Sequence, residues 1–224
     1  MSSSNARNIV ELRQLLADKF PGVRMSADRP ETIANRFATG LPRLDSLLEG
    51  GLPKGAITEI VSSGIASGTS LFIASLLERA RESGEWIALI DSSDSFDPTP
   101  FPNEILSRLL WVRCNDPRQA IKATDLLLHD ATLSIVVLDL LFSPPNQIRK
   151  TPSSTWFRLQ RILENTATAF VVLAPEHMIS NAAARFTLEK RFSLESLDHR
   201  RETLLAQIAP TPLEAGKQRI VKMA

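Results

Sequence analysis

Four short runs rich in Val, Ile, Leu and Ala recur along the chain, and a segment long enough to form a helix separates each run from the next. The runs cover residues 57–61, 86–90, 134–138 and 169–174. Apolar strands that alternate with helices are typical of a mostly parallel sheet with helices on both faces. We therefore expect a three-layer α/β domain.

The segments between these runs predict the remaining elements. Helices are expected at 69–83, 103–109, 116–129 and 153–165, and a further strand at 110–113. Asp116 followed by Pro117 is a typical helix start, because aspartate caps free N–H groups and proline fits the first turn. Pro144-Pro145 predicts a loop. Residues 203–208 and 218–223 are expected to form an antiparallel pair of strands at the C-terminal end.

Composition and charge exclude several classes of protein. The 224 residues carry 26 Lys and Arg against 25 Asp and Glu, and this net charge of +1 excludes a polybasic chain. No apolar run approaches the roughly 18 residues of a membrane span. The N-terminus lacks the pattern of a secretory signal, so we expect a cytoplasmic protein without a membrane partner. The single cysteine, Cys114, excludes an intrachain disulfide and a cysteine-built zinc site, and we expect it to be buried and unreactive.

The N-terminal part of the chain differs from the rest. Residues 8–20 carry apolar side chains at helical spacing, and Pro21-Gly22 follows them. The next stretch, 23–36, is polar and has the character of a linker. We therefore expect an N-terminal helix and linker over residues 1–36 and one core domain over residues 37–224.

Glycine is concentrated in one part of the core domain. Six of the nine glycines lie between Gly40 and Gly68. Ligands of parallel α/β sheets bind beyond the carboxyl ends of the strands. In this chain that edge is expected to hold the loop 62–68, Asp91, Asp139 and Ala174.

Three segments in the same order resemble the RecA-type ATPase core. Residues 39–60 contain Thr-Gly, Leu-Asp, Gly-Gly-Leu-Pro and Glu-Ile in the arrangement that precedes the phosphate loop of that family. Residues 90–98 resemble its Ile-Asp strand and Asp-Pro turn, and residues 135–139 its Walker B strand. The resemblance covers about residues 37–194 and implies a RecA-like, P-loop NTPase-type fold.

The phosphate loop departs from the family pattern. A Walker A loop has glycines that turn its backbone N–H groups toward phosphates and a lysine that reaches the β- and γ-phosphates. In residues 62–70, a glycine stands where the lysine belongs, and the hydroxyl that binds magnesium is retained. The resemblance implies a vestigial nucleotide site of Gly64, Gly68, Thr69, Ser70 and Asp139. Two alternatives remain: a plain strand-to-helix turn, or weak nucleotide binding at the helix N-terminus.

The catalytic carboxylate of the family is also replaced. The residue expected to activate the attacking water is Ser93, which is not a base near neutral pH. Asp94 is one residue away, and the nearest lysine, Lys54, lies before the strand and not after it. We expect a pseudo-ATPase with no catalytic residue, no metal and no cofactor. The alternative is an active ATPase that binds ATP and magnesium and recruits Lys54 or a neighbouring subunit.

Residues 143–163 contain four basic residues and no acidic one. The four are Arg149, Lys150, Arg158 and Arg161, with Trp156 and Phe157 between them. Basic and aromatic side chains together suit phosphate contacts and base stacking. In the RecA core the corresponding connection carries a DNA-contacting loop, so the resemblance implies a nucleic-acid site here. The alternative is a solvated helix face with both aromatic residues in the core.

A RecA-like chain with an N-terminal helix and an eroded phosphate loop resembles the ImuA family. The resemblance implies an accessory role in DNA repair, in the SOS response to DNA damage and in translesion synthesis. Its implied partners are translesion polymerase components or a RecA-type filament, with single-stranded DNA and self-association as further expectations. The same resemblance extends to SulA division inhibitors, so binding to a cell-division protein is the alternative function.

Overall fold

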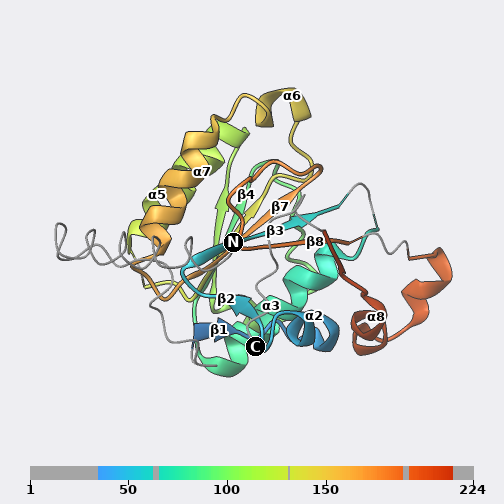
Figure 1. Cartoon of the computed structure of the whole chain (residues 1–224). Coiled ribbons are helices and arrows are strands. Elements are labelled where there is room, and N and C mark those ends of the chain that lie inside the picture. Colours follow the sequence, from blue (N-terminus) through green and yellow to red (C-terminus); the bar gives the residue numbers. More distant parts are fainter. Residues whose placement is uncertain (1–34, 63–65, 131, 189–191, 214–224) are drawn as a thin grey trace, which may run out of the picture. The chain divides into compact units, whose positions relative to one another are not determined.

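The computed structural model describes residues 35–62, 66–130, 132–188 and 192–213. Within these residues the largest sheet has seven strands in the order β5-β4-β6-β7-β3-β8-β9 (Figure 1). All neighbouring pairs are parallel except β8 and β9, which are antiparallel. The strands are β3 (Ala56–Val61), β4 (Ile87–Asp91), β5 (Leu109–Arg113), β6 (Ile135–Asp139), β7 (Ala169–Ala174), β8 (Ala184–Thr187) and β9 (Thr211–Pro212).

Helices connect these strands, and a short ribbon precedes them. The helices are α2 (Pro42–Leu47), α3 (Thr69–Ser83), α4 (Asn103–Leu106), α5 (Pro117–Asp130), α6 (Pro145–Ile148), α7 (Ser153–Leu163) and α8 (Arg201–Gln207), with a 3-10 helix at Leu194–Asp198. The ribbon pairs β1 (Arg36–Phe37) with β2 (Leu52–Pro53) in antiparallel register. No helix in the described part of the chain has the length and apolar character that crossing a bilayer requires.

The sheet is buried on both faces. Side chains of a strand alternate between its two faces, so Ile87 and Leu89 of β4 join one apolar cluster while Ala88 and Ile90 join the other. The first cluster includes α2 and α3, and the second includes α5 and α7, which lie on the opposite side of the sheet in Figure 1. The expected three-layer α/β architecture with a mostly parallel sheet is confirmed.

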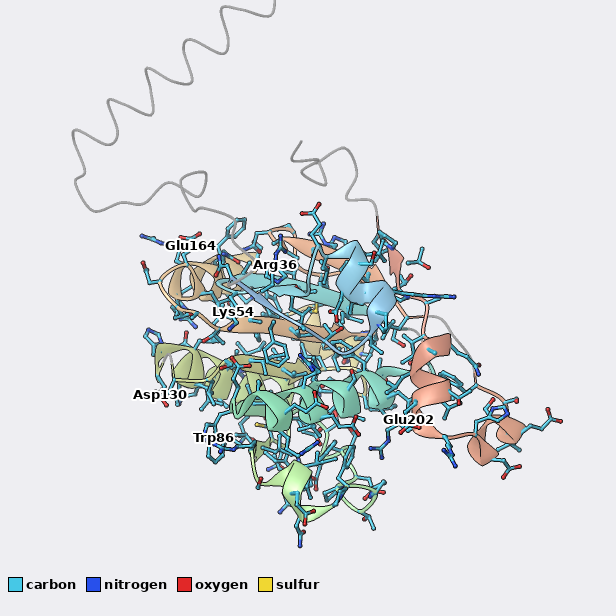
Figure 2. The ribbon with its side chains drawn as sticks, turned by 90° about the horizontal axis from the view of Figure 1, so that it is seen from below. Arg36, Lys54, Trp86, Asp130, Glu164 and Glu202 are labelled. Atoms are coloured by element: carbon cyan, nitrogen blue, oxygen red, sulfur yellow. The ribbon has the colours of Figure 1, made fainter. Side chains whose placement is uncertain are left out.

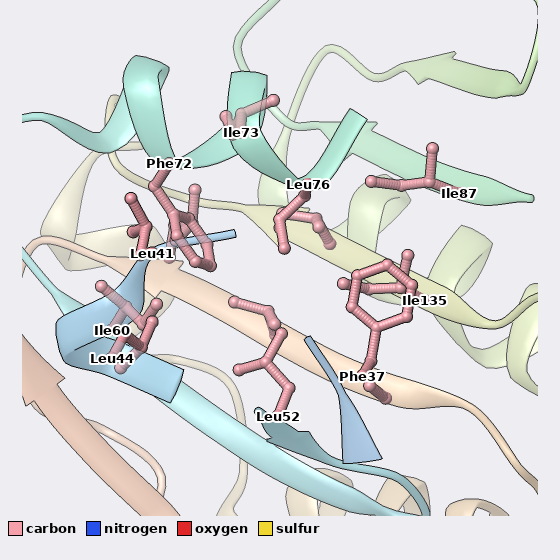
Figure 3. Packing of buried hydrophobic residues seen from close by; sticks show 14 of the residues in the cluster. Phe37, Leu41, Leu44, Leu52, Ile60, Phe72, Ile73, Leu76, Ile87 and Ile135 are labelled. Carbon is pink, nitrogen blue, oxygen red and sulfur yellow. The ribbon is translucent and has the colours of Figure 1, made fainter. Parts of the chain in front are cut away.

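The helix that follows the phosphate-loop segment is anchored by its apolar face. Phe72 and Leu76 of α3 are fully buried in the same cluster as Ile60 and Ile135 of the sheet, as Figure 3 shows. Burying each such side chain stabilises the fold by about 1.5–3 kcal/mol. The N-terminus of α3 is therefore held firmly at the carboxyl end of β3.

Several expected elements are confirmed, and the start of α5 shows why. Pro117 is its first residue, and Asp116 accepts a hydrogen bond on Oδ1 from the N–H of Gln119 at 2.8 Å. This is the capping arrangement expected from the Asp-Pro pair. Cys114 is buried, as expected, and burial raises the pKa of its thiol, with smaller contributions from nearby carboxylates.

Three expectations at the level of elements are wrong. Residues 203–208 belong mostly to the helix α8 and not to a strand, because Leu, Ala, Gln, Glu and Arg all favour a helix. Among the described residues of this part of the chain, the antiparallel pair is formed by β8 and β9. Pro144-Pro145 leads into the short helix α6, whose first residue is the second proline. The helix expected over 103–109 ends at Leu106, and residue 109 already belongs to β5. The helix expected at 8–20 and the strand at 218–223 lie outside the described residues.

Candidate functional site

The carboxyl ends of the central strands bring together the residues that the sequence places at this edge. Asp91 and Asp139 are opposite each other in the β4–β6 register. Ser62 follows β3, and its N–H donates to the carbonyl oxygen of Ala174 at 3.0 Å. The hydroxyl of Ser62 is buried and has no hydrogen-bond partner within the described residues. This edge is therefore the place to test for a nucleotide site.

The phosphate-loop segment runs from Ser62 to Ser70, and Gly64 lies outside the described residues. Ala66 has a φ of 62° and Gly68 a φ of 93°, so both residues adopt left-handed backbone conformations. Gly68 is the N-cap of α3 and has no side chain to cap the helix. Thr69 is half-buried, and its hydroxyl lies 3.5 Å from that of Ser67. Ser70 is exposed.

Apolar side chains from the C-terminal part of the chain cover Gly68. A Cβ atom at this glycine would lie 3.3 Å from Cε2 of Phe192 and 3.5 Å from Cγ1 of Ile208. The N–H of Phe192 also donates to the carbonyl oxygen of Ala66 at 3.3 Å. Ile208 is only 1% exposed. The direction in which a lysine side chain would leave this position is therefore occupied by the protein itself.

The covering segment is fixed to α3 by Arg201 at the start of α8. Its Nη1 lies 3.2 Å from Oε1 of Glu78, and its guanidinium carbon lies 5.1 Å from the ring centroid of Phe101. The partly buried ion pair holds α8 beside α3, and the cation–π contact holds α8 against the loop that precedes α4. We call residues 192–208 the cover segment.

Asp91 organises the loop that follows β4. Its Oδ1 accepts hydrogen bonds from the N–H of Ser93 at 3.1 Å and from the hydroxyl of Ser95 at 3.3 Å. Its Oδ2 accepts one from the N–H of Phe96 at 2.8 Å. Asp94 has a φ of 52°, and its carboxylate lies 3.7 Å from the guanidinium of Arg113. The loop therefore directs Asp94 toward a cation at the sheet edge.

Asp139 at the end of β6 has a raised pKa of about 6, and burial of its carboxyl group is the largest cause. The nearby charge of Asp91 raises the pKa further. The N–H of Leu141, which donates to Oδ1 at 3.0 Å, acts in the opposite direction and lowers it. Part of the Asp139 population is therefore neutral near pH 6. No set of three or more His, Cys, Asp or Glu residues in the described ranges is grouped in a way that could hold a metal ion.

These features do not fit a magnesium triphosphate. The loop offers no cation at Gly68, its helix N-terminus is covered by Phe192 and Ile208, and the Asp139 carboxylate is already bonded to a backbone N–H. Lys54 stands before β3, whereas Gly68 follows it, and a six-residue strand spans about 20 Å. Lys54 is ion-paired with Glu85 at 3.5 Å instead.

The four basic residues of the segment 143–163 occupy two places. Arg149 and Lys150 follow α6, and Arg158 and Arg161 lie one turn apart on α7. The guanidinium of Arg149 donates to both carboxylate oxygens of Glu176 at 2.6 Å, which lowers the pKa of that carboxyl group.

The remaining side chains of this segment differ in exposure. Arg158 lies 3.2 Å from Oδ1 of Asp125. Lys150 and Arg161 are exposed. Trp156 is 2% exposed and belongs to the core, whereas Phe157 is 52% exposed. One aromatic residue is therefore structural, and the other is available at the surface.

Sequence reasoning missed a buried charge network around Glu59 in the middle of β3. Glu59 is fully buried and accepts hydrogen bonds from the N–H groups of Met178 and Ile179, both at 2.8 Å. Its Oε2 lies 2.6 Å from Nδ1 of His177 and 3.0 Å from Nε of Arg185. A glutamate within an apolar strand must be paired when it is buried, so its position was a signal for such a network.

Comparisons with known proteins support a RecA-like core. Protein RecA of Chlorobaculum tepidum is 29% identical over 121 residues, which cover 52% of this chain and 34% of RecA. Protein RecA of Nostoc sp. is 32% identical over 114 residues, covering 50% of this chain and 30% of RecA. Protein RecA of Paracoccus denitrificans is 30% identical over 121 residues, covering 52% and 33%. No protein-family model matches the chain. The chain thus spans about a third of the length of the curated relatives it matches, and it contains a RecA-like core.

Proposed function

We propose that this chain is a non-catalytic RecA-like accessory protein of the DNA-damage response. In this role it binds translesion polymerase components or a RecA-type filament, together with single-stranded DNA. The observation that carries the proposal is the cover segment: Phe192 and Ile208 pack against Gly68, at the position of the missing lysine. These two side chains lie where a lysine side chain at this position would begin, and this supports a loop that does not hold a triphosphate.

The charges around the covered loop support the same proposal. Phosphoryl transfer requires cations that neutralise the transferred group and a base that positions the nucleophile. Ser93 stands at the position of the base, and the neighbouring Asp94 is paired with Arg113. Asp139, with a pKa of about 6, holds its charge weakly. These residues therefore supply neither a cation that neutralises the transferred phosphoryl group nor a base that positions the nucleophile.

The proposed DNA contacts are Arg149, Lys150, Arg158 and Arg161. Lys150 and Arg161 are exposed and make no ion pair with another described residue, so they can approach phosphates directly. Phe157, at 52% exposure on α7, offers a face on which a base can stack. These contacts are independent of base sequence and therefore suit single strands of any composition.

Calorimetric titration with ATP and magnesium tests the proposal at the loop. We expect no saturable heat at about 1 mM nucleotide, where a specific site would have at least about 4 kcal/mol of binding free energy. Micromolar binding would overturn the proposal. So would ATP turnover that disappears in Asp139→Ala, because it would establish an active ATPase with an unorthodox loop.

A second titration tests the nucleic-acid part with a labelled single-stranded oligonucleotide. We expect binding that weakens with salt and weakens further in the Lys150→Gln and Arg161→Gln variants. Arg118→Gln removes one exposed positive charge from α5 and serves as the matched control. Binding to purified translesion polymerase subunits, measured in the same buffer, tests the protein partner.

A SulA-like role is the second candidate, and one observation favours it. Arg149 and Arg158 are already paired with Glu176 and Asp125, which reduces the positive charge that DNA would meet. Binding to a purified cell-division protein without measurable DNA binding would support this candidate over the first.

A further inference from the structure

A second polar site lies at the opposite end of the sheet from Gly68. Here the start of β1, the residue after β2 and the last turns of α3 surround a cavity of about 200 Å³. It is lined by Arg36, Phe37, Ala38, Lys54, Arg79, Ser83 and Glu85. Figure 2 shows Arg36 and Lys54 close together on this side of the molecule.

The backbone brings the first two cations together. In the β1–β2 register Arg36 is opposite Pro53, directly before Lys54, and the N–H of Lys54 donates to the carbonyl oxygen of Asn35 at 2.9 Å. This pairing needs a glycine nearby, because a Cβ atom at Gly51 would lie 2.2 Å from the carbonyl oxygen of Phe37. The ribbon thus places Arg36 and Lys54 one register position apart on neighbouring segments, and both side chains line the cavity.

Arg79 adds a third cation from α3. Its stem lies over Gly40, where a Cβ atom would come within 3.1 Å of its Cγ. Its Nη1 donates to Oε2 of Glu82, an exposed residue outside the cavity lining, at 2.6 Å. A guanidinium has five N–H donors, so this single contact leaves others for a further acceptor.

The lining carries more positive than negative charge. Glu85 is its one carboxylate among the described residues, against three cations. Glu85 Oε1 lies 3.5 Å from Nζ of Lys54, and its Oε2 accepts the hydroxyl hydrogen of Ser83 at 2.9 Å. The side chain of Lys54 is only 15% exposed. Charges that are shielded from water interact more strongly than exposed ones, so an anion in the cavity would be attracted by the surplus of positive charge in the lining.

We propose that this cavity binds the dianionic phosphate group of a phosphate monoester. Guanidinium and ammonium groups are the side chains that bind phosphate most strongly, through charge-assisted hydrogen bonds. A volume of about 200 Å³ holds a phosphate group but is smaller than the roughly 300–1,000 Å³ of sites that enclose whole ligands. The remainder of the ligand therefore lies outside. The source of the group is either a free phosphate compound or the 5′-phosphate of a DNA end.

Calorimetric titrations of the full chain at constant ionic strength test this site. The probes are inorganic phosphate, adenosine monophosphate, and one oligonucleotide with either a 5′-phosphate or a 5′-hydroxyl end. We expect saturable phosphate binding that weakens about tenfold in Lys54→Gln, since one charge-assisted bond is lost. Glu85→Gln is expected to bind phosphate more tightly than the natural chain, because the competing carboxylate is gone.

The controls separate the site from unspecific charge effects. Arg118→Gln removes one exposed positive charge elsewhere and should bind phosphate as the natural chain does. Arg36→Gln replaces Lys54→Gln if the latter does not fold, as judged by its unfolding midpoint. Tighter binding of the 5′-phosphorylated oligonucleotide than of the 5′-hydroxyl one, with the difference lost in Lys54→Gln, assigns the site to DNA ends. Equal affinity for phosphate and the monophosphate assigns it to small phosphate compounds.

Three results overturn the proposal: no saturable heat with any phosphate probe, unchanged affinity in both cation variants, or weaker binding in Glu85→Gln. The site and the proposed function fail separately, because Lys54→Gln and Glu85→Gln change only the cavity lining and leave the Gly68 loop and α7 as they are. The two oligonucleotides differ only in the 5′ end, so contacts of the rest of the strand with α7 are the same for both.

Discussion

Gly68→Ala is the substitution that reports most directly on the cover segment. The change adds one Cβ atom at a backbone φ of 93°. A residue with a Cβ atom loses about 1–2 kcal/mol in the left-handed region. The new atom also lies 3.3 Å from Phe192 and 3.5 Å from Ile208, which is tighter than ordinary packing for the first contact.

The expected loss of stability is the sum of these two effects less one gain. Overpacking of an apolar contact costs about 1–3 kcal/mol. Replacing glycine by alanine restricts the unfolded chain, and this raises the free energy of unfolding by about 0.4–1 kcal/mol. We therefore expect Gly68→Ala to lower the free energy of unfolding by about 1–5 kcal/mol. Gly84→Ala is the matched control, because its φ of 70° carries the backbone cost while no atom lies within 4 Å of the added Cβ.

Urea unfolding of the two variants measures the loss of stability in each, which should be larger by the overpacking cost of about 1–3 kcal/mol for Gly68→Ala. A double variant with Phe192→Ala should lose less than the sum of the single losses by about 0.5 kcal/mol or more, because the crowded ring is gone. Equal losses in Gly68→Ala and Gly84→Ala, with additivity to Phe192→Ala, would refute the packing of the cover segment on the loop.

Three further outcomes are expected. Glu59→Gln should lower the free energy of unfolding by about 3 kcal/mol or more, because it leaves the buried guanidinium of Arg185 without its counter-charge, whereas Glu82→Gln in an exposed pair should cost less than about 1 kcal/mol. The folded-state pKa of Asp139, about 6, exceeds its ordinary value of 3.8. Stability linked to this group therefore rises as pH falls from about 6 to about 4, and Asp139→Asn should remove that slope and add up to about 3 kcal/mol at pH 8 in urea titrations. An Asp139→Asn variant that is less stable at pH 8 would contradict this. Arg161→Gln should reduce the salt slope of single-strand binding by about 1 in fluorescence anisotropy, and Arg149→Gln by less, since Arg149 is already held by a carboxylate. Equal reductions would contradict the role given to that ion pair.

The central part of the fold was predictable because its signals are local. The apolar runs at Ala56–Val61 and Ala169–Ala174 are long enough and β-rich enough to be strands without help from their surroundings. Residues Thr69–Ser83 have helical spacing between two glycines, and the structure gives these bounds for α3. In contrast, the apolar residues between Thr203 and Ile208 fit neither period clearly. The helix-favouring residues of this stretch decide for α8, which ends at Gln207.

The cover over the candidate site could not be predicted, because it depends on contacts between distant residues. Gly68 predicts a weakened phosphate loop from its own identity. Nothing near it in the sequence indicates that Phe192 and Ile208 fill the space above it. The same holds for the partners of Arg149 and Arg158, whose carboxylates come from other segments. Sequence patterns gave the residues of the site, and the tertiary fold determines what surrounds them.

During synthesis on the ribosome, β3 is completed long before β7 and β8, the two strands that pair with it. Glu59 precedes its partners His177 and Arg185 by 118 and 126 residues. Because translation adds about 5–20 residues per second, β3 remains unpaired for on the order of ten seconds. Strands β4, β5 and β6 can pair among themselves in that interval. A charged glutamate in the middle of an otherwise apolar, unpaired strand opposes association between nascent chains. The carboxylate that later fixes the β7–β8 connection thus protects the strand before that connection has been made.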